Sequence, residues 1–172
     1  AQVFQALAIR EVLGQVEGSE AVLGVALAAW LLGGAAGVLL GRRFPGTALG
    51  PAAVSAAALA ILGLLAVRFA RGWLPLAPGE VPGIGTGLLL AAGGGFVPAL
   101  GYGFAFPLGA RLLDGKGAYA IEAAGALVGG ALFTFVLAPC VPPAGIAALA
   151  LGVSAAPFLG AARPVAGIAV AA

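Results

Sequence analysis

Residues 103–137 read GFAFPLGARLLDGKGAYAIEAAGALVGGALFTFVL, and this stretch decides the fold. Two apolar runs meet there across a short polar turn, residues 114–117. The second run carries a carboxylate, Glu122, in an otherwise apolar segment. Each run is too long and too continuously apolar for a half-buried strand, so the stretch predicts a helical hairpin embedded in lipid.

The composition of the whole chain supports a membrane protein. Hydrophobic residues make up 62% of the sequence and charged residues 8%, whereas water-soluble domains carry about a quarter charged residues. The mean hydropathy is +1.16. Residues 21–41 contain no charge and are long enough to cross a bilayer core of roughly 30 Å. Because the apolar runs are continuous rather than alternating, we expect an all-α, polytopic integral membrane bundle.

We expect one domain with about six transmembrane helices. The first helix is too short to span and is expected to be truncated; with no methionine at position 1, the chain is expected to be a fragment of something longer. Residues from Arg163 onward are expected to begin a seventh helix. Residues 84–113 would run about 45 Å as one helix, so Pro98 and Pro107 predict a kink or a break. The expected helices cover residues 1–13, 20–41, 49–67, 84–113, 118–138 and 144–162.

Small residues mark the faces where helices are expected to pack. Ala29, Gly33, Gly37 and Gly41 recur every four residues and therefore share one face of their helix. Such a stripe lets two helix backbones approach closely in lipid. Gly125 and Gly129 form a similar pair in the later hairpin.

The basic residues predict an orientation. Positive charges in short loops favour the cytoplasmic side, and five lie on one side of the expected bundle against three on the other. The N-terminus is therefore expected in the cytoplasm. The five are Arg42, Arg43, Arg111, Lys116 and Arg163, and the three are Arg10, Arg68 and Arg71.

Glu122 is the main candidate for a functional site, because ionisable groups within membrane helices are costly and are functional hypotheses by default. Tyr119 lies three residues earlier, on the same helix face. Arg111 and Lys116 are expected at the same end of the membrane. Three roles stay open for Glu122: a structural ion pair that fastens the hairpin, a proton- or cation-binding carboxylate, or a contact to another subunit.

The other charged residues suggest ion pairs at the opposite end. Arg10 is expected to meet Glu17 or Glu20, which leaves Glu11 without an obvious partner. Cys140 is the single cysteine and matches no metal spacing. No cofactor or metal site is expected, and a net charge of +2 is too small to suggest nucleic acid.

Several stretches together resemble the N-terminal membrane domain of the membrane-embedded, spermidine synthase-like proteins of bacteria. The resemblance covers most of residues 2–137. It rests on Arg10-Glu11, Glu17-Gly-Ser-Glu20, residues 27–33 (LAAWLLG) with Gly37, Phe106-Pro-Leu108, residues 118–122 (AYAIE), Gly125, Gly129-Gly130 and Phe133.

The resemblance implies a bacterial inner-membrane domain similar to one half of a major facilitator transporter. It also implies a soluble C-terminal domain of the aminopropyltransferase type, which this sequence does not contain. Gly41 stands where the transporter loop has an acidic residue. The chain has no catalytic constellation, so any aminopropyltransferase activity would belong to the missing domain.

Two functions from different classes are therefore expected. The first is an anchoring or scaffolding domain that packs against lipids, other membrane subunits, a soluble domain or a second copy of itself. The second is a transporter half or conduit for a small solute such as a polyamine. A polycation site should bring several acidic or aromatic side chains to one cavity, and the sequence offers only Glu122, Trp30, Tyr102 and Tyr119 as candidates. An enzyme embedded in the membrane is the weakest hypothesis, because the chain has no histidine and no paired acids at helical spacing.

Overall fold

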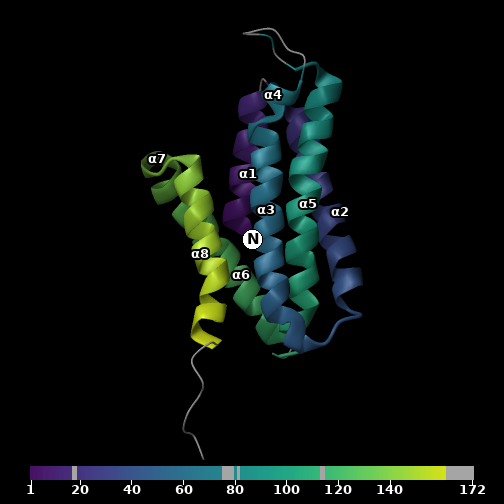
Figure 1. The fold of residues 1–172 in the computed structure, drawn as a ribbon, viewed down its shortest axis with the longest axis vertical. Coiled ribbons are helices and arrows are strands. Elements are labelled where there is room, and N and C mark those ends of the chain that lie inside the picture. Colours follow the sequence, from purple (N-terminus) through teal and green to yellow (C-terminus); the bar gives the residue numbers. More distant parts are fainter. Residues whose placement is uncertain (17–18, 75–79, 81, 113–114, 162–172) are drawn as a thin grey trace, which may run out of the picture.

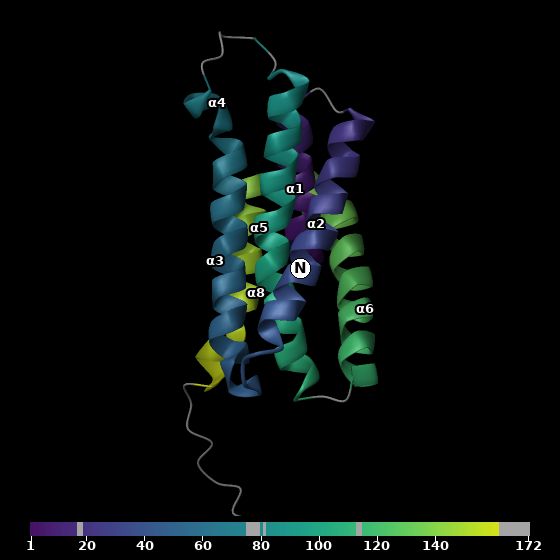
Figure 2. The same ribbon diagram turned by 90° about the vertical axis from the view of Figure 1, so that its right-hand side faces the viewer.

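The computed structural model describes residues 1–16, 19–74, 80, 82–112 and 115–161, without the side chains of Arg71 and of residues 154–161. No strand occurs in this part of the chain, and helices form an upright bundle (Figures 1 and 2). The helices are α1 (Gln2–Gln15), α2 (Glu20–Gly41), η1 (Gly46–Ala48), α3 (Leu49–Arg68), α4 (Ala70–Trp73), α5 (Ile84–Ala110), α6 (Gly115–Leu132), η2 (Phe133–Leu137), α7 (Ala138–Cys140) and α8 (Pro143–Ala161).

The all-helical fold agrees with the prediction from sequence. Four helical segments are long and apolar enough to cross a membrane: residues 20–41, 46–68, 84–110 and 115–140. The expected number of about six spans is not reached among the described residues. α1 has 14 residues, about 21 Å of helix, and the described apolar part of α8 is also short. The seventh helix expected from Arg163 lies outside the described residues.

The contact between α2 and α5 is the most extensive in the bundle. The two helices run in the same direction, because Gly33, Gly37 and Gly41 of α2 face the carbonyls of residues 96, 100 and 104 of α5 in that order. Ala29 and these three glycines are all buried. α5 contributes Gly95 and Gly103, and a Cβ on Gly95 would lie 2.5 Å from the carbonyl oxygen of Ala26. The two backbones therefore touch, as small residues permit in lipid.

α5 is one helix of 27 residues, with Pro98 and Pro107 inside it. The break expected near these prolines does not occur. A proline removes one backbone hydrogen bond, but membrane helices tolerate it because neighbouring helices pack around the site. Pro98 is buried and lies against Gly63 of α3, and the ring of Pro107 lies close to Gly41 of α2.

α6, η2 and α8 stand beside the main bundle (Figure 1). The span that contains α6 is only 6% buried, against 28 to 39% for the other three spans. η2 is a π-helical turn that joins α6 to α7 without interrupting the helical path, so this span continues from Gly115 to Cys140. Most of α6 is therefore available to lipid or to another protein.

Enlarging Gly37 is expected to destabilise the bundle. A Cβ at this position would lie 2.6 Å from the backbone nitrogen of Phe104, so Gly37→Ala forces α2 and α5 apart at a cost of about 1 to 3 kcal/mol. Gly24→Ala is the matched control on the same helix, because nothing lies within 4 Å of its Cβ position. Thermal unfolding in detergent compares the two variants, and an equal effect of both would contradict the close contact.

Candidate functional site

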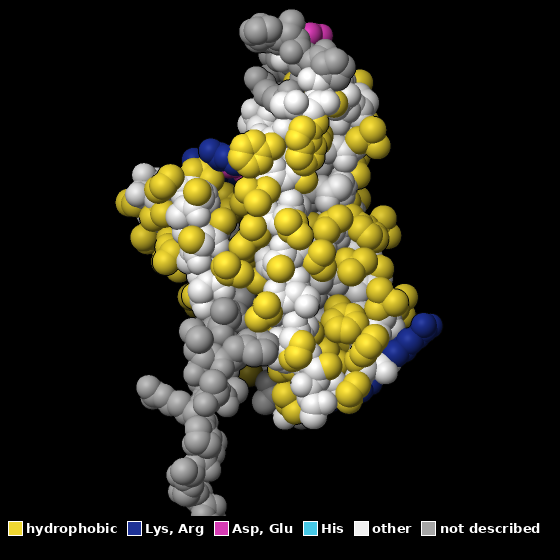
Figure 3. Space-filling model, in the orientation of Figure 1, with side chains coloured by type: hydrophobic (Ala, Val, Ile, Leu, Met, Phe, Trp, Pro, Cys, Tyr) yellow, Lys and Arg dark blue, Asp and Glu magenta, His cyan; other side chains and the backbone are white. Residues whose placement is uncertain are grey.

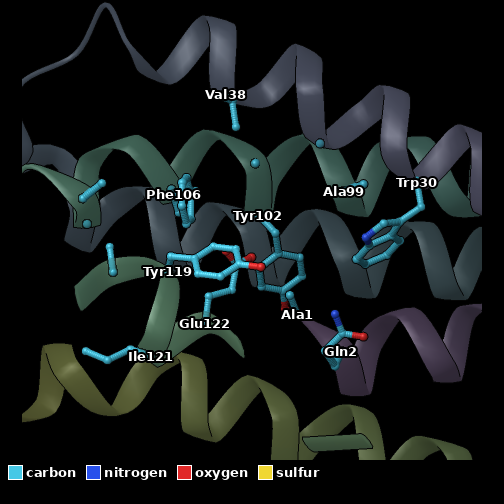
Figure 4. A pocket seen from close by; sticks show the side chains of 16 residues that line it. Ala1, Gln2, Trp30, Val38, Ala99, Tyr102, Phe106, Tyr119, Ile121 and Glu122 are labelled. Atoms are coloured by element: carbon cyan, nitrogen blue, oxygen red, sulfur yellow. The ribbon is translucent and has the colours of Figure 1, made fainter. Parts of the chain in front are cut away.

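A cavity of about 610 Å³ lies between α2, α5 and α6 and is open on one side. Its volume falls within the range of small-molecule sites. It is lined mainly by apolar and small residues, with Gln2, Trp30, Tyr102, Phe106, Tyr119 and Glu122 as its polar and aromatic side chains (Figure 4). The four candidates for a conduit, Trp30, Tyr102, Tyr119 and Glu122, thus border the same space.

Helix α6 supplies the carboxylate. Tyr119 and Glu122 are three residues apart and face the cavity from the same side of the helix. Glu122 follows the start of α6 by seven residues, about 10 Å along the axis, so it lies inside the span rather than at its end. Among the described residues no ion-pair partner lies within 4 Å of its carboxylate.

The opposite wall of the cavity is aromatic. The rings of Trp30 on α2 and Tyr102 on α5 stack with centroids 6.4 Å apart and an interplanar angle of 28°. Phe4 of α1 lies behind Tyr102, with ring centroids 5.9 Å apart. The α2–α5 contact brings the two rings together. Gly95 of α5 packs closely on α2 at Trp30, since an added Cβ would lie 3.3 Å from the backbone nitrogen of Trp30. The sequence alone did not place Phe4 or Phe106 near this cavity, since their positions depend on which helices are neighbours.

Arg111 does not pair with Glu122, contrary to one expectation from sequence. Its guanidinium donates hydrogen bonds to the backbone carbonyls of Arg42 and Phe44, in the turn after α2. The end of α5 is thereby joined to the end of α2, which is consistent with their parallel course. Lys116 is exposed at the start of α6. The structural-pair hypothesis for Glu122 therefore has no support from Arg111.

At the other end of the bundle, Glu11 has a partner that the sequence did not indicate. Nη1 of Arg68 lies 3.2 Å from both carboxylate oxygens of Glu11, which is buried, with 9% of its surface exposed. Arg10 donates to the carbonyl oxygen of Ala138 at 3.3 Å, and Glu20 is exposed. Glu17, the other expected partner of Arg10, lies outside the described residues.

The remaining candidates are on or near α6. Gly129 faces α1, where a Cβ would lie 3.6 Å from Val3, and Gly125 borders a cavity between α6, α1 and α8 in which an added Cβ would meet nothing within 4 Å. Cys140 is exposed. No group of three or more metal-ligating side chains occurs in the described part of the chain.

The cavity has the chemistry to hold an organic cation. A carboxylate attracts a positive charge, and the faces of tryptophan and tyrosine rings attract cations when these lie within about 6 Å. The attraction is strengthened where water is scarce. Glu122 and the tyrosine of the same helix lie across from the stacked Trp30 and Tyr102 (Figure 4).

No family model, curated protein or solved structure matches the chain.

The Glu11–Arg68 pair yields a prediction about stability. Arg68→Gln leaves a buried carboxylate without its charged partner, so the unfolding free energy is expected to fall by about 1 to 3 kcal/mol. Lys116→Gln, at an exposed position, is the matched control. The double variant Arg68→Gln, Glu11→Gln is expected to lose less unfolding free energy than the two single variants lose together, because the two side chains interact. Additive losses in detergent unfolding would contradict a direct pair.

Proposed function

We propose that this chain is a membrane-embedded domain that binds an organic cation in the cavity beside Glu122, as one half of a transporter or conduit for a small solute. One observation carries the proposal: a carboxylate inside a membrane-spanning segment borders the same 610 Å³ cavity as Trp30, Tyr102 and Tyr119. Intramembrane carboxylates face cavities or partners rather than lipid.

The resemblance to spermidine synthase-like membrane domains, together with the single carboxylate, favours a linear amine as the solute. A protonated amine could place its charge at Glu122 and its alkyl chain along the apolar lining. The proposal includes an orientation. The end of α2, the end of α5 and the start of α6 lie at one end of the bundle (Figure 1), and the basic residues at these helix ends would make it the cytoplasmic end in a bacterial inner membrane. These residues are Arg42, Arg43, Arg111 and Lys116.

Tryptophan fluorescence tests binding at this cavity. The chain has two tryptophans, so Trp73→Phe leaves Trp30, on the cavity wall, as the sole emitter. Adding spermidine to the purified protein in detergent is expected to change the Trp30 emission in a saturable way. Glu122→Gln in the same background is expected to weaken binding about tenfold or more, the amount expected for loss of a charged hydrogen bond.

Glu20→Gln is the matched control, because Glu20 is an exposed carboxylate at the start of α2 and does not line the cavity. Equal affinities for the parent and for Glu122→Gln would contradict the site.

Uptake of spermidine by proteoliposomes tests transport. We expect flux above background with the parent and only background flux with Glu122→Gln. Background uptake by the parent would remove the conduit from the proposal.

A second candidate function, membrane anchoring and scaffolding, is favoured by α6. Leu127 of α6 is 75% exposed and Phe135 of the following η2 is 78% exposed, so large apolar side chains of this span face outward. Such a face suits a partner membrane subunit, the membrane part of a soluble domain, or a second copy.

The scaffold predicts a complex in mild detergent. The polypeptide mass from light scattering is expected to exceed that of one chain, and Leu127→Ser is expected to reduce it by removing apolar contact area. Leu31→Ser is the matched control, since that leucine is 72% exposed but lies on α2. A monomer without any co-purifying polypeptide would count against scaffolding.

A further inference from the structure

A smaller groove of about 280 Å³ runs between α3 and α5 on the outside of the bundle. It begins at Phe44, in the turn after α2, and follows α3 upward. Its floor is made of small residues, which keep the two helices close: a Cβ on Gly101 would lie 2.7 Å from Cα of Ala56. The residues that define it here are Phe44, Ala48, Ala52, Ser55, Leu59 and Phe104.

The length of the groove matches half of a bilayer. From Ala48, at the end of η1, to Leu59 of α3 the lining residues cover eleven helical steps, about 16 Å along the helix axis. One leaflet of a hydrocarbon core of roughly 30 Å is about 15 Å deep. A single acyl chain lying along α3 would therefore reach from the headgroup level to the bilayer centre.

Two aromatic rings line one end of the groove, and positive charges lie beside that end in the sequence. Phe44 and Phe104 meet edge to face, with ring centroids 5.0 Å apart. Arg42 and Arg43, directly before Phe44, have exposed side chains. Figure 3 shows basic side chains projecting at the lower right of a largely hydrophobic surface, where Figure 1 places the turn after α2.

Arg111 gives this turn a fixed position. Its guanidinium donates to the carbonyls of Arg42 and Phe44, so it holds the backbone on either side of Arg43. The two exposed arginines are thereby kept beside the mouth of the groove. Guanidinium groups bind phosphate oxygens well, in a bidentate geometry where the approach allows.

We propose that this groove binds an anionic phospholipid, with the phosphate at Arg42 and Arg43 and one acyl chain between α3 and α5. The positive charges of the two arginines favour an anionic headgroup, and the apolar floor of the groove favours a lipid over a water-soluble anion. Arg111 acts as a positioning residue through the turn. The site is separate from the Glu122 cavity, which shares no lining residue with it.

Native mass spectrometry of the full chain tests the proposal. The protein is purified in detergent and mixed with phosphatidylglycerol or with phosphatidylcholine of the same acyl chains. Retention of phosphatidylglycerol is expected to exceed that of phosphatidylcholine about tenfold, as two arginines near a lipid surface allow. Equal retention of the two lipids would overturn the proposal.

Variants separate the charge from the groove. Arg42→Gln with Arg43→Gln is expected to remove the preference for phosphatidylglycerol, whereas Arg42→Lys with Arg43→Lys keeps it. Ser55→Leu fills the groove and is expected to lower retention of both lipids several-fold. Lys116→Gln, a basic residue at the same end that does not line the groove, is the matched control.

Two outcomes overturn the proposal besides equal retention. One is a Ser55→Leu variant that unfolds at the parent's temperature and retains both lipids at the parent's level. The other is full competition by glycerol 3-phosphate, which would show that a free anion, rather than a lipid, is bound. Where the glutamine pair fails to fold, the Ser55→Leu variant and the competition by glycerol 3-phosphate still decide the issue.

Discussion

The close parallel contact of α2 with α5 is the constraint on which the rest of the structure depends. Gly33, Gly37 and Gly41 face carbonyls of α5, while Gly95 and Gly103 face carbonyls of α2. At this separation Cα–H groups can donate weak hydrogen bonds to carbonyl oxygens, and dispersion acts over the full length of both helices. Lipid supplies no hydrophobic force between helices, so such fitting of backbones is the main source of their association.

This contact also positions both proposed binding sites. On one side it brings Trp30 of α2 and Tyr102 of α5 into a stacked pair at the wall of the Glu122 cavity. At the lower end of the two helices it places Arg111 within reach of the turn after α2, beside the groove between α3 and α5. α6, in contrast, is sparsely packed, so the wall that carries Glu122 is the part of the cavity with the fewest contacts to restrain it.

The sequence was sufficient to predict the helical class, most helix boundaries within a few residues and the small-residue face of α2. It did not indicate the partner of that face. Gly93-Gly94-Gly95 and the two prolines are typical of a break, and only packing against α2 and α3 explains why α5 continues. Side-chain partners were the hardest to predict: Glu122 had two candidates, Arg111 and Lys116, and Glu11 had none, because the choice depends on helix adjacency, which periodicity does not encode.

The register of α2 against α5 is the most direct test of the account. Spin labels are introduced in a Cys140→Ala background at Leu32 of α2, paired with either Phe96 or Leu89 of α5, all of which are exposed. Phe96 and Leu89 share a face and differ by seven residues, about 10 Å along the axis. The account predicts a shorter electron-spin distance in lipid for Leu32 with Phe96 than for Leu32 with Leu89. Equal distances, or the reverse order, would contradict it.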